Sequence, residues 1–287
     1  MRLASVHSPR APRPPRPNHE QPPAGLDSWL ASVDAAREPA VRLVEIDGVT
    51  CVIKRRRPSF ARGVSYAVRY LRAAMLGAGC KLVLGEWPAP GVLVHNGLAH
   101  EAARLRALDQ ANWRVPQVWS FEPGELVLEY VGDDMPGVLR RGTPEQQQMM
   151  VDAIALELAA FHAQALWHGG AQVRNLTWHR GDIWRIDFEE NIGAALSLPL
   201  AQAYDVYQCL SSLVALRGLS EAVAQSLGDR FLQGYLKAND DAAVRAGLTR
   251  MARSICGASR VIRPVLGWMP GRDVQGFFRV ADTLRLL

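Results

Sequence analysis

Cysteine is scarce in this sequence, and the four cysteines stand far apart. Cys51, Cys80, Cys209 and Cys256 form no Cys-x-x-Cys pair and do not cluster with histidines. Zinc ribbons and disulfide frameworks both need cysteines at short, regular spacings, so neither is predicted. We expect free thiols, mostly buried, in a reducing compartment.

Long uncharged apolar runs are also missing. No stretch approaches the roughly 20 apolar residues that a membrane-spanning helix needs, and the segment from Met1 to Pro23 lacks the apolar centre of a secretory signal. We therefore expect a cytoplasmic protein, with attachment to the surface of the inner membrane left open. Hydrophobic residues make up 48% of the 287 residues, which is enough to build a buried core.

The first 27 residues are rich in proline, arginine and serine and poor in apolar side chains. Such a segment buries too little surface to offset the entropy lost when it becomes ordered. Residues 1–27 are therefore predicted to be a disordered, basic tail.

The next part of the chain has the pattern of a β-rich unit. The run Val41–Lys54 predicts a hairpin, because an Asp-Gly turn signal lies between two apolar, β-branched segments. Leucines and alanines at helical spacing predict a helix over Gly97–Gln110. Two further strands are expected at Pro116–Ser120 and Glu125–Val131.

The second half of the chain is mainly helical. A long amphipathic helix is predicted over Pro144–Leu166, and helices again dominate from Leu200 to the end. Between them, two short strands are expected at Leu176–Trp178 and Ile183–Phe188. A β-rich half followed by an α-rich half indicates two lobes with a cleft between them.

Polar residues gather around the two short strands. His162 lies near the end of the long predicted helix, His168 opens the following loop, and Asn175 stands seven residues after His168. The second strand then leads to Asp187, within an Asp-Phe-Glu sequence. Each residue alone also fits an ordinary structural role, so the information lies in their order and spacing.

This order resembles the catalytic segment of the protein-kinase superfamily. The resemblance implies ATP and Mg²⁺ as cofactors and an α+β, two-lobed protein-kinase-like fold. The N-lobe, residues 28–131, would be β-rich, with one helix like helix αC of kinases and a basic helical insertion. The C-lobe, residues 132–287, would be α-rich.

The same resemblance implies roles for single residues. Lys54, at the end of the second strand, would contact the phosphates of ATP, and Glu101 would be its ion-pair partner. Asp187 and Asn175 would hold Mg²⁺, a hard cation that prefers oxygen ligands. The other implied roles are the hinge that touches adenine, Glu129, Tyr130 and Val131; the catalytic-loop histidine, His168; and the buried brace of that loop, Asp205 with His162.

Within the superfamily, the sequence is most similar to the lipopolysaccharide core kinases and 3-deoxy-manno-octulosonic acid kinases of Gram-negative bacteria. The similarity rests on the Asp-Gly hairpin, the strand ending in Lys54, the helix that starts His-Glu-Ala-Ala-Arg-Leu, and the Trp-Arg-Val-Pro sequence after it. It implies a lipid-linked sugar or another small-molecule, non-protein acceptor. The short interval from Asp187 to Asp205 agrees, because it leaves little room for a segment that docks protein substrates.

The stretch from Lys54 to Gly85 is basic and contains no acidic residue. Within it, Ser59–Leu76 is predicted to be helical, and such a helix can lie on an anionic membrane or bind a phosphorylated glycolipid. A solvated arginine face explains the pattern equally well, and no nucleic-acid motif accompanies it. The arginines considered for the membrane contact are Arg55, Arg56, Arg57, Arg62, Arg69 and Arg72.

The pattern departs from that of kinases at two places. Gly170 stands where the catalytic aspartate normally accepts the proton of the acceptor hydroxyl, and glycine has no group that can do so. Gln172, Glu189 and Glu190 are candidates to replace it. No glycine-rich phosphate loop is visible either, since Ser28–Ala40 contains no glycine.

Two main hypotheses therefore stay open. The retained lysine, asparagine and aspartate favour an active ATP-dependent kinase. The missing catalytic aspartate favours a pseudokinase that binds nucleotide weakly or not at all and serves as a regulatory or scaffold protein. A peripheral membrane-binding protein with a degenerate kinase core is a third alternative, and the sequence does not indicate an oligomeric state.

Overall fold

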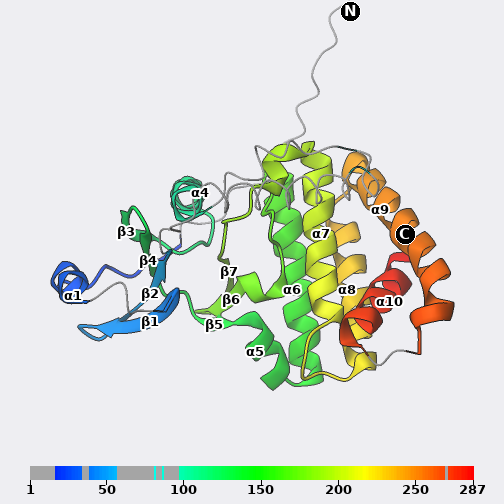
Figure 1. The fold of residues 1–287 in the computed structure, drawn as a ribbon, viewed down its shortest axis with the longest axis horizontal. Helices are drawn as coiled ribbons and strands as arrows, with labels where there is room; N and C mark the ends of the chain where they lie inside the picture. The colour runs from blue at the N-terminus through cyan, green and yellow to red at the C-terminus, as the bar shows by residue number, and fades with distance from the viewer. Residues whose placement is uncertain (1–16, 34–38, 57–80, 82–85, 87–96, 269–270) are drawn as a thin grey trace, which may run out of the picture.

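The computed structural model describes residues 17–33, 39–56, 81, 86, 97–268 and 271–287. These residues form two lobes, one built around a β-sheet and the other mostly of helices (Figure 1). The expected α+β architecture, with a β-rich first lobe and an α-rich second lobe, is confirmed. The predicted basic insertion lies outside the described residues.

The N-lobe sheet is antiparallel, with the strand order β1-β2-β4-β3. Asp47 and Gly48 connect β1 to β2 with φ angles of 51° and 77°, the left-handed conformations that a two-residue type I′ turn requires. The Asp-Gly pair therefore sets the hairpin register. The strands are β1 Val41–Ile46, β2 Val49–Arg55, β3 Val118–Glu122 and β4 Glu125–Glu129.

Helix α4, Leu98–Gln110, packs against this sheet. Its apolar side chains, including Leu105, join Leu126 and Leu128 of β4 in one buried cluster. Glu101 is buried as well. Because a buried carboxylate is costly without a partner, α4 must present Glu101 to a group of opposite charge.

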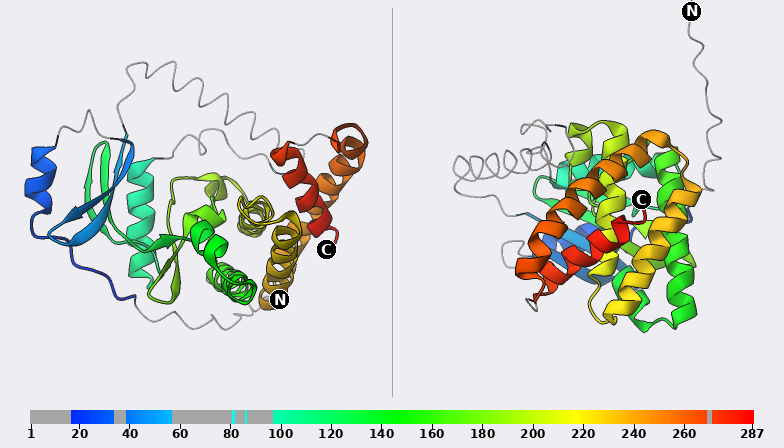
Figure 2. Two further views of the ribbon diagram at one scale, coloured as in Figure 1. Left: turned by 90° about the horizontal axis from the view of Figure 1, so that it is seen from below. Right: turned by 90° about the vertical axis from the view of Figure 1, so that its right-hand side faces the viewer.

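The C-lobe is a bundle in which α8 packs against both α6 and α7, and α9 packs against α7 and α10 (Figure 2). Thr143 and Gln146 form a reciprocal capping box at the start of α6, which explains why this helix begins at the predicted residue. The helices are α5 Met135–Arg141, α6 Pro144–Ala163, α7 Leu198–Val214, α8 Glu221–Ala238, α9 Ala242–Leu266 and α10 Arg272–Leu284.

A small antiparallel sheet of order β5-β6-β7 lies beside α5 and α6 at the junction of the lobes (Figure 1). It consists of β5 Asp133–Asp134, β6 Leu176–His179 and β7 Asp182–Arg185, and the short 3₁₀ helix η1, Val173–Asn175, leads into β6. The prediction extended the last strand to Phe188, which is too long. Asp187 has a φ of 67°, a left-handed conformation that no extended strand contains.

Residues 17–25, part of the predicted disordered tail, form specific contacts, whereas residues 1–16 lie outside the described residues. The ring of His19 is hydrogen-bonded to Glu129 and Asp109, and helix α1, Leu26–Ser32, begins with a buried leucine that joins a core cluster of the sheet. Polar contacts with distant parts of the N-lobe hold this segment.

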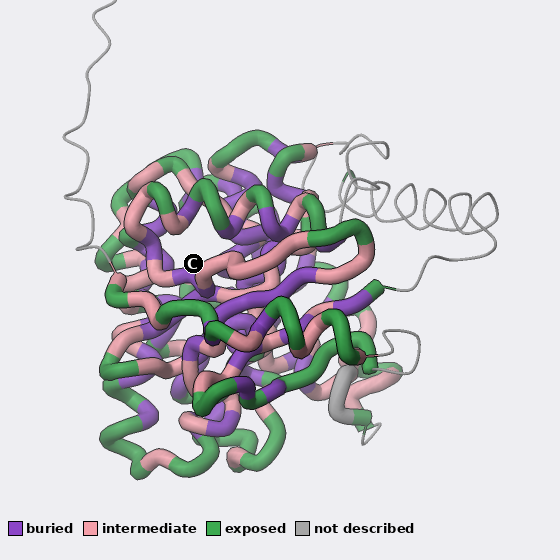
Figure 3. The backbone as a smooth tube through the Cα atoms, turned by 90° about the vertical axis from the view of Figure 1, so that its left-hand side faces the viewer, coloured by how far each residue is buried: buried purple, intermediate pink, exposed green. Residues whose placement is uncertain are grey.

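Burial follows the two-lobe arrangement. Buried stretches run through the interior, while the outer turns of the helices are exposed (Figure 3). In the part of the chain that the structure describes, no helix is both long and apolar enough to cross a membrane.

Candidate functional site

Three charged side chains from separate elements meet where the lobes join. The ammonium group of Lys54, on β2, donates to Glu101 Oε1 of α4 at 2.7 Å and to Asp187 Oδ1, beyond β7, at 3.0 Å. These are the lysine, the helix glutamate and the metal-binding aspartate expected from the sequence. The fold thus brings together residues that lie 47 and 133 positions apart in the chain.

Electrostatics keep this lysine charged. Burial alone would lower the pKa of Lys54, but Glu101 and Asp187 more than offset this and hold its pKa above the usual value. The side chain of Glu101 is 0% exposed, and burial raises its pKa against the opposing effect of Lys54. The site therefore holds a cation in place before any anion binds, which lowers the cost of binding phosphate groups.

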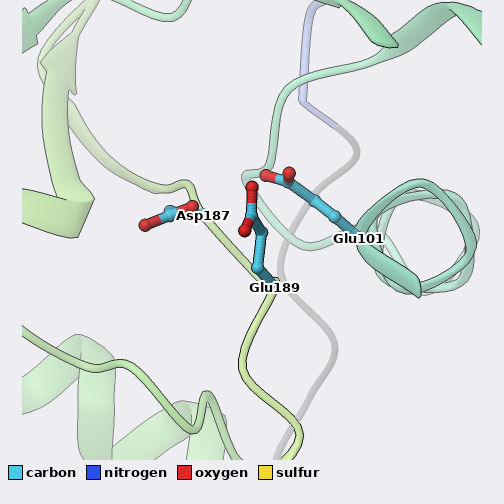
Figure 4. A group of neighbouring side chains, drawn as sticks. All are labelled: Glu101, Asp187 and Glu189. Atoms are coloured by element: carbon cyan, nitrogen blue, oxygen red, sulfur yellow. The ribbon is translucent and has the colours of Figure 1, made fainter. Parts of the chain in front are cut away.

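Oxygen ligands suited to a divalent cation surround the same point. Carboxylate oxygens of Glu101, Asp187 and Glu189 lie within 4.8 Å of one another, and the groups of Glu101 and Glu189 face each other (Figure 4). Glu101 Oε2 is buried and has no hydrogen-bond partner. Hard carboxylate oxygens and an unpartnered acceptor fit Mg²⁺, and the side chain of Asp187, 39% exposed, is the most accessible of the ligands.

Asn175 is buried at the end of η1. Its amide nitrogen donates to the carbonyl of Gly170 at 2.8 Å, so the amide oxygen is the atom left for a metal ion. The backbone carbonyl of Asn175 accepts a hydrogen bond from the backbone N–H of Ile186 at 3.0 Å. This bond ties the catalytic loop to the segment that carries Asp187.

A buried aspartate on α7 braces the loop. The carboxylate of Asp205 accepts hydrogen bonds from the backbone N–H groups of His168 at 2.5 Å and of Gly169 at 2.7 Å. Burial alone would raise the pKa of Asp205, but hydrogen bonds, first among them one from His162, hold it below the usual value. Asp205 is therefore ionised at neutral pH and fixes two consecutive peptide groups of the loop.

Behind Asp205 runs a chain of buried hydrogen bonds. The ring of His162 contacts Asp205 at 3.4 Å and the hydroxyl of Tyr235 at 2.7 Å. Burial lowers the pKa of His162, so the ring is neutral and donates from Nε2 to the carboxylate while Nδ1 accepts from Tyr235. Asn239 donates to the same tyrosine at 2.9 Å. These hydrogen bonds connect Asp205 to Tyr235 of helix α8.

His168 acts in the structure as a positioning residue, although the sequence placed it with the catalytic group. It is buried, and burial, together with the charge of Arg185, lowers its pKa to about 3. Neutral Nδ1 accepts from Gly170 N–H at 3.1 Å, and Nε2 donates to Ile186 O at 3.1 Å. Its ring stacks on Phe188 at 4.2 Å. Both ring nitrogens are therefore engaged by the backbone.

Arg104 links α4 to the catalytic loop and was missed by the sequence analysis. Its guanidinium group donates to the carbonyls of His168 at 2.9 Å and of Trp167 at 2.5 Å. It also lies over the rings of Trp167 and Phe188, at 3.9 and 4.9 Å from their centroids. The sequence feature that could have indicated Arg104 is its position three residues after Glu101, because residues at that spacing share a helix face.

The predicted hinge has its side chains engaged by the protein. Glu129 is buried, and its carboxylate accepts hydrogen bonds from the backbone of Glu20 at 2.8 Å and of Gln117 at 3.1 Å, beside the ring of His19 at 2.5 Å. The hydroxyl of Tyr130 contacts Asp133 at 3.3 Å. Val131 is buried, and its carbonyl accepts from Thr177 at 2.5 Å. The hinge is thus fixed by the segment before α1, which sequence reasoning did not connect with it.

Two arginines of the predicted basic surface form ion pairs with glutamates of the same protein. Arg55 is buried and forms an ion pair with Glu125 at 2.5 Å. Arg56 forms an ion pair with Glu189. The other arginines of that surface lie outside the described residues, and their contact with a membrane remains a prediction.

Comparison with known proteins supports the kinase-like assignment of the fold. A family model described as the RIO domain matches residues 90–196, which is less than half of the chain. The matched segment includes α4, the strands β3 and β4, the catalytic loop and Asp187. Together with the two-lobed architecture, it places the described chain in the protein-kinase-like fold class.

The individual relatives add little about function. An uncharacterized protein of Haemophilus influenzae is 34% identical over 93 residues, which are 31% of this chain and 38% of that protein. The structure of Rv3197 from Mycobacterium tuberculosis in complex with erythromycin is 16% identical and covers 86% of this chain and 71% of that one, with a TM-score of 0.39. That score supports no argument about ligands. The finer resemblance to lipopolysaccharide kinases is not supported by these comparisons.

Proposed function

We propose that this protein is an ATP-dependent phosphotransferase that requires Mg²⁺ and acts on a hydroxyl group of a non-protein acceptor. The observation that carries the proposal is the Lys54 ammonium group held between Glu101 and Asp187. A buried lysine bridging two carboxylates of distant elements is costly to build. It is useful where the phosphates of a nucleotide and its metal ion must be bound together.

The residues would divide the work as follows. Lys54 binds the phosphates next to the nucleoside, and Glu101 orients it. Asp187 and Asn175 hold Mg²⁺, which neutralises the charge of the phosphates when bound. Glu129, Tyr130 and Val131 form the hinge for adenine, and contacts there are made by the backbone, because the carboxylate of Glu129 is engaged by His19.

A small acceptor is favoured by the segment after Asp187. Residues 188–197 connect Asp187 directly to α7 and contain the short 3₁₀ helix η2, Ile192–Ala195. This leaves no long loop in the described chain to dock a protein substrate. We propose a lipid-linked sugar or a related small hydroxyl compound, met at the inner face of a membrane through the basic stretch that starts at Arg56.

A pseudokinase is the second candidate, and one observation favours it. Gly170 stands at the centre of the catalytic loop, where kinases have a carboxylate. The loop is otherwise braced as an active loop is, by Asp205. In this alternative, the nucleotide site serves binding or regulation without phosphate transfer.

Thermal unfolding with and without MgATP tests the proposal. Ligand at about 100 times its Kd stabilises the folded state by about 2.7 kcal/mol, which raises the melting temperature by several degrees. We expect this shift in the wild type and its loss in Lys54→Met and Asp187→Asn. Asp152→Asn, which breaks an exposed ion pair on the C-lobe, should keep it.

Transfer of phosphate is then measured with [γ-³²P]ATP and water or sugar hydroxyls as acceptors. Turnover by the wild type that is lost in Asp187→Asn supports the enzyme. A shift without any turnover favours a pseudokinase that binds nucleotide. No shift at millimolar MgATP contradicts the proposed enzyme and favours a pseudokinase that binds no nucleotide.

A further inference from the structure

The place of the missing catalytic aspartate is next to another carboxylate. A Cβ atom added to Gly170 would lie 3.6 Å from the carboxyl carbon of Glu190, 3.4 Å from Asn175 Nδ2 and 3.7 Å from His168 Nδ1. An aspartate carboxylate would extend from that Cβ by a single bond. The carboxyl group of Glu190 therefore occupies the immediate surroundings of the absent group.

The backbone of the catalytic loop allows this approach. Gly169 has a φ of 90°, and a Cβ atom on it would come within 2.9 Å of the carbonyl oxygen of Glu190. Any side chain at residue 169 would push this segment away. The stacking of Phe188 on His168 holds the same segment against the loop from the other side. The two glycines thus do different things: Gly169 lets Glu190 approach, and Gly170 leaves room for it.

Two polar side chains lie near Glu190. Gln208 donates a hydrogen bond to its carboxylate, and the charge of Arg174 acts on Glu190 as well. The residue remains exposed, so a captured proton can pass to solvent. Gln208 Oε1 is buried without a hydrogen-bond partner, which leaves an acceptor beside Glu190 for a hydroxyl donor.

The other two candidates fit less well. Glu189 forms an ion pair with Arg56 of the N-lobe and lies in the carboxylate group around Asp187. The side chain of Gln172 is an amide, which is not a useful base. Among the three residues named from the sequence, Glu190 is the carboxylate that lies at Gly170.

We propose that Glu190 is the catalytic residue that accepts the proton of the acceptor hydroxyl, in place of an aspartate at residue 170. This inference rests on the proposed function. The hydroxyl oxygen forms a bond to the γ-phosphorus of ATP, the bond from that phosphorus to the bridging oxygen breaks, and ADP leaves with the electron pair. The proton of the hydroxyl group passes to the Glu190 carboxylate and then to solvent.

The test uses the full-length protein and four variants. Glu190→Gln removes the base with little change of shape. Glu190→Gln combined with Gly170→Asp returns a carboxylate to the loop, and the ordinary contact distances around the added Cβ show that the backbone accepts it. Glu122→Gln, an exposed glutamate at the end of β3, is the matched control, and Asp187→Asn reports on the metal site.

Hydrolysis of MgATP, with water as the acceptor, and binding of MgATP by calorimetry are measured for each. We expect Glu190→Gln to lose about 10²-fold or more in kcat with an unchanged Kd for MgATP, and the double variant to recover most of the rate. Glu122→Gln should equal the wild type.

The calorimetric Kd for MgATP is a readout independent of turnover, and a Kd that weakens as much as the rate falls would show that Glu190 serves binding instead. Unchanged turnover in Glu190→Gln, or such a change of Kd, overturns the inference and leaves the proposed function standing. Binding of MgATP without turnover in the wild type overturns both the inference and the enzyme, whereas no binding at all overturns the nucleotide site.

Discussion

The two halves of the site differ in how many of the residues expected in a kinase they contain. The half proposed to bind nucleotide, Lys54 with Glu101 and Asp187, is called the nucleotide half here and has all three charged groups in contact. The catalytic loop retains its supports, because Asp205 still holds two of its peptide groups and Asn175 still bonds to its backbone. It lacks only the carboxylate at Gly170. The residues that hold the loop in shape are therefore different from the residue that would accept the proton, and either can be lost without the other.

This difference has a physical reason. Asp205 is buried and satisfies several donors at once, so its loss would cost folding free energy whatever the protein does. A catalytic carboxylate at residue 170 would contribute little to stability, and a neighbour such as Glu190 can supply the same group. The loop can thus keep its shape while a residue at another position supplies the proton acceptor.

The largest effect is expected from the brace. Asp205→Ala leaves two backbone N–H groups and a histidine without their acceptor, and we expect it to lower the free energy of unfolding by about 4 kcal/mol. Urea denaturation followed by circular dichroism measures this. Asp152→Ala on the surface should change stability by less than about 1 kcal/mol. Similar values for the two variants would contradict the role of Asp205 as a brace.

In the nucleotide half, the loss of stability on replacing Lys54 should depend on whether Glu101 is charged. Lys54→Met leaves Glu101 buried without a counter-charge, and we expect a loss of about 3 kcal/mol in unfolding free energy. Adding Glu101→Gln should restore a large part of it, because the uncompensated charge is gone. A double-mutant cycle measures the coupling. Purely additive losses would show that the two residues do not act as a buried pair.

Disrupting the contact between the halves, made by Arg104, should have an intermediate effect on stability. Arg104→Lys retains the charge but cannot bond two carbonyls while stacking on two rings, and we expect a loss of about 2 kcal/mol. Arg106→Lys, on the exposed side of the same helix, serves as the control and should be neutral. Equal behaviour of the two variants in thermal unfolding would remove Arg104 from the link between α4 and the loop.

The smallest effect is expected at the hinge and depends on pH. Burial lowers the pKa of His19, but hydrogen bonds and charges from Glu129 and Asp109 outweigh it, so the pKa in the folded state is raised. Its stabilising contribution is full below the unfolded pKa of about 6.5 and is lost as pH rises through the folded pKa.

His19→Gln should therefore cost about 1.5 kcal/mol at pH 6 and clearly less at pH 9, as measured by urea denaturation at both values. His100→Gln is the control, because burial lowers the pKa of His100 and its contribution cannot show this sign. A cost for His19→Gln that does not depend on pH would mean that the histidine acts only by packing against Trp184.

Much of the fold could be predicted because the signals were local. The Asp-Gly turn and the leucine face of α4 each involve residues within a few positions of one another, and both appear in the structure. The contacts of residues 17–25, within the predicted tail, could not be predicted, for the opposite reason. These contacts are made by His19 with partners 90 and 110 residues away, which composition cannot reveal.

The sequence by itself determined the order of the elements and the identity of the charged residues at the nucleotide site, since short-range patterns specify strands, helices and turns. Only the tertiary structure decided which charges meet. It buried Arg55, turned His168 into a positioning residue, joined Arg104 to the loop and brought Glu190, rather than Glu189, to Gly170. Such choices depend on packing between segments far apart in the chain, where a shift of a few ångströms exchanges one partner for another.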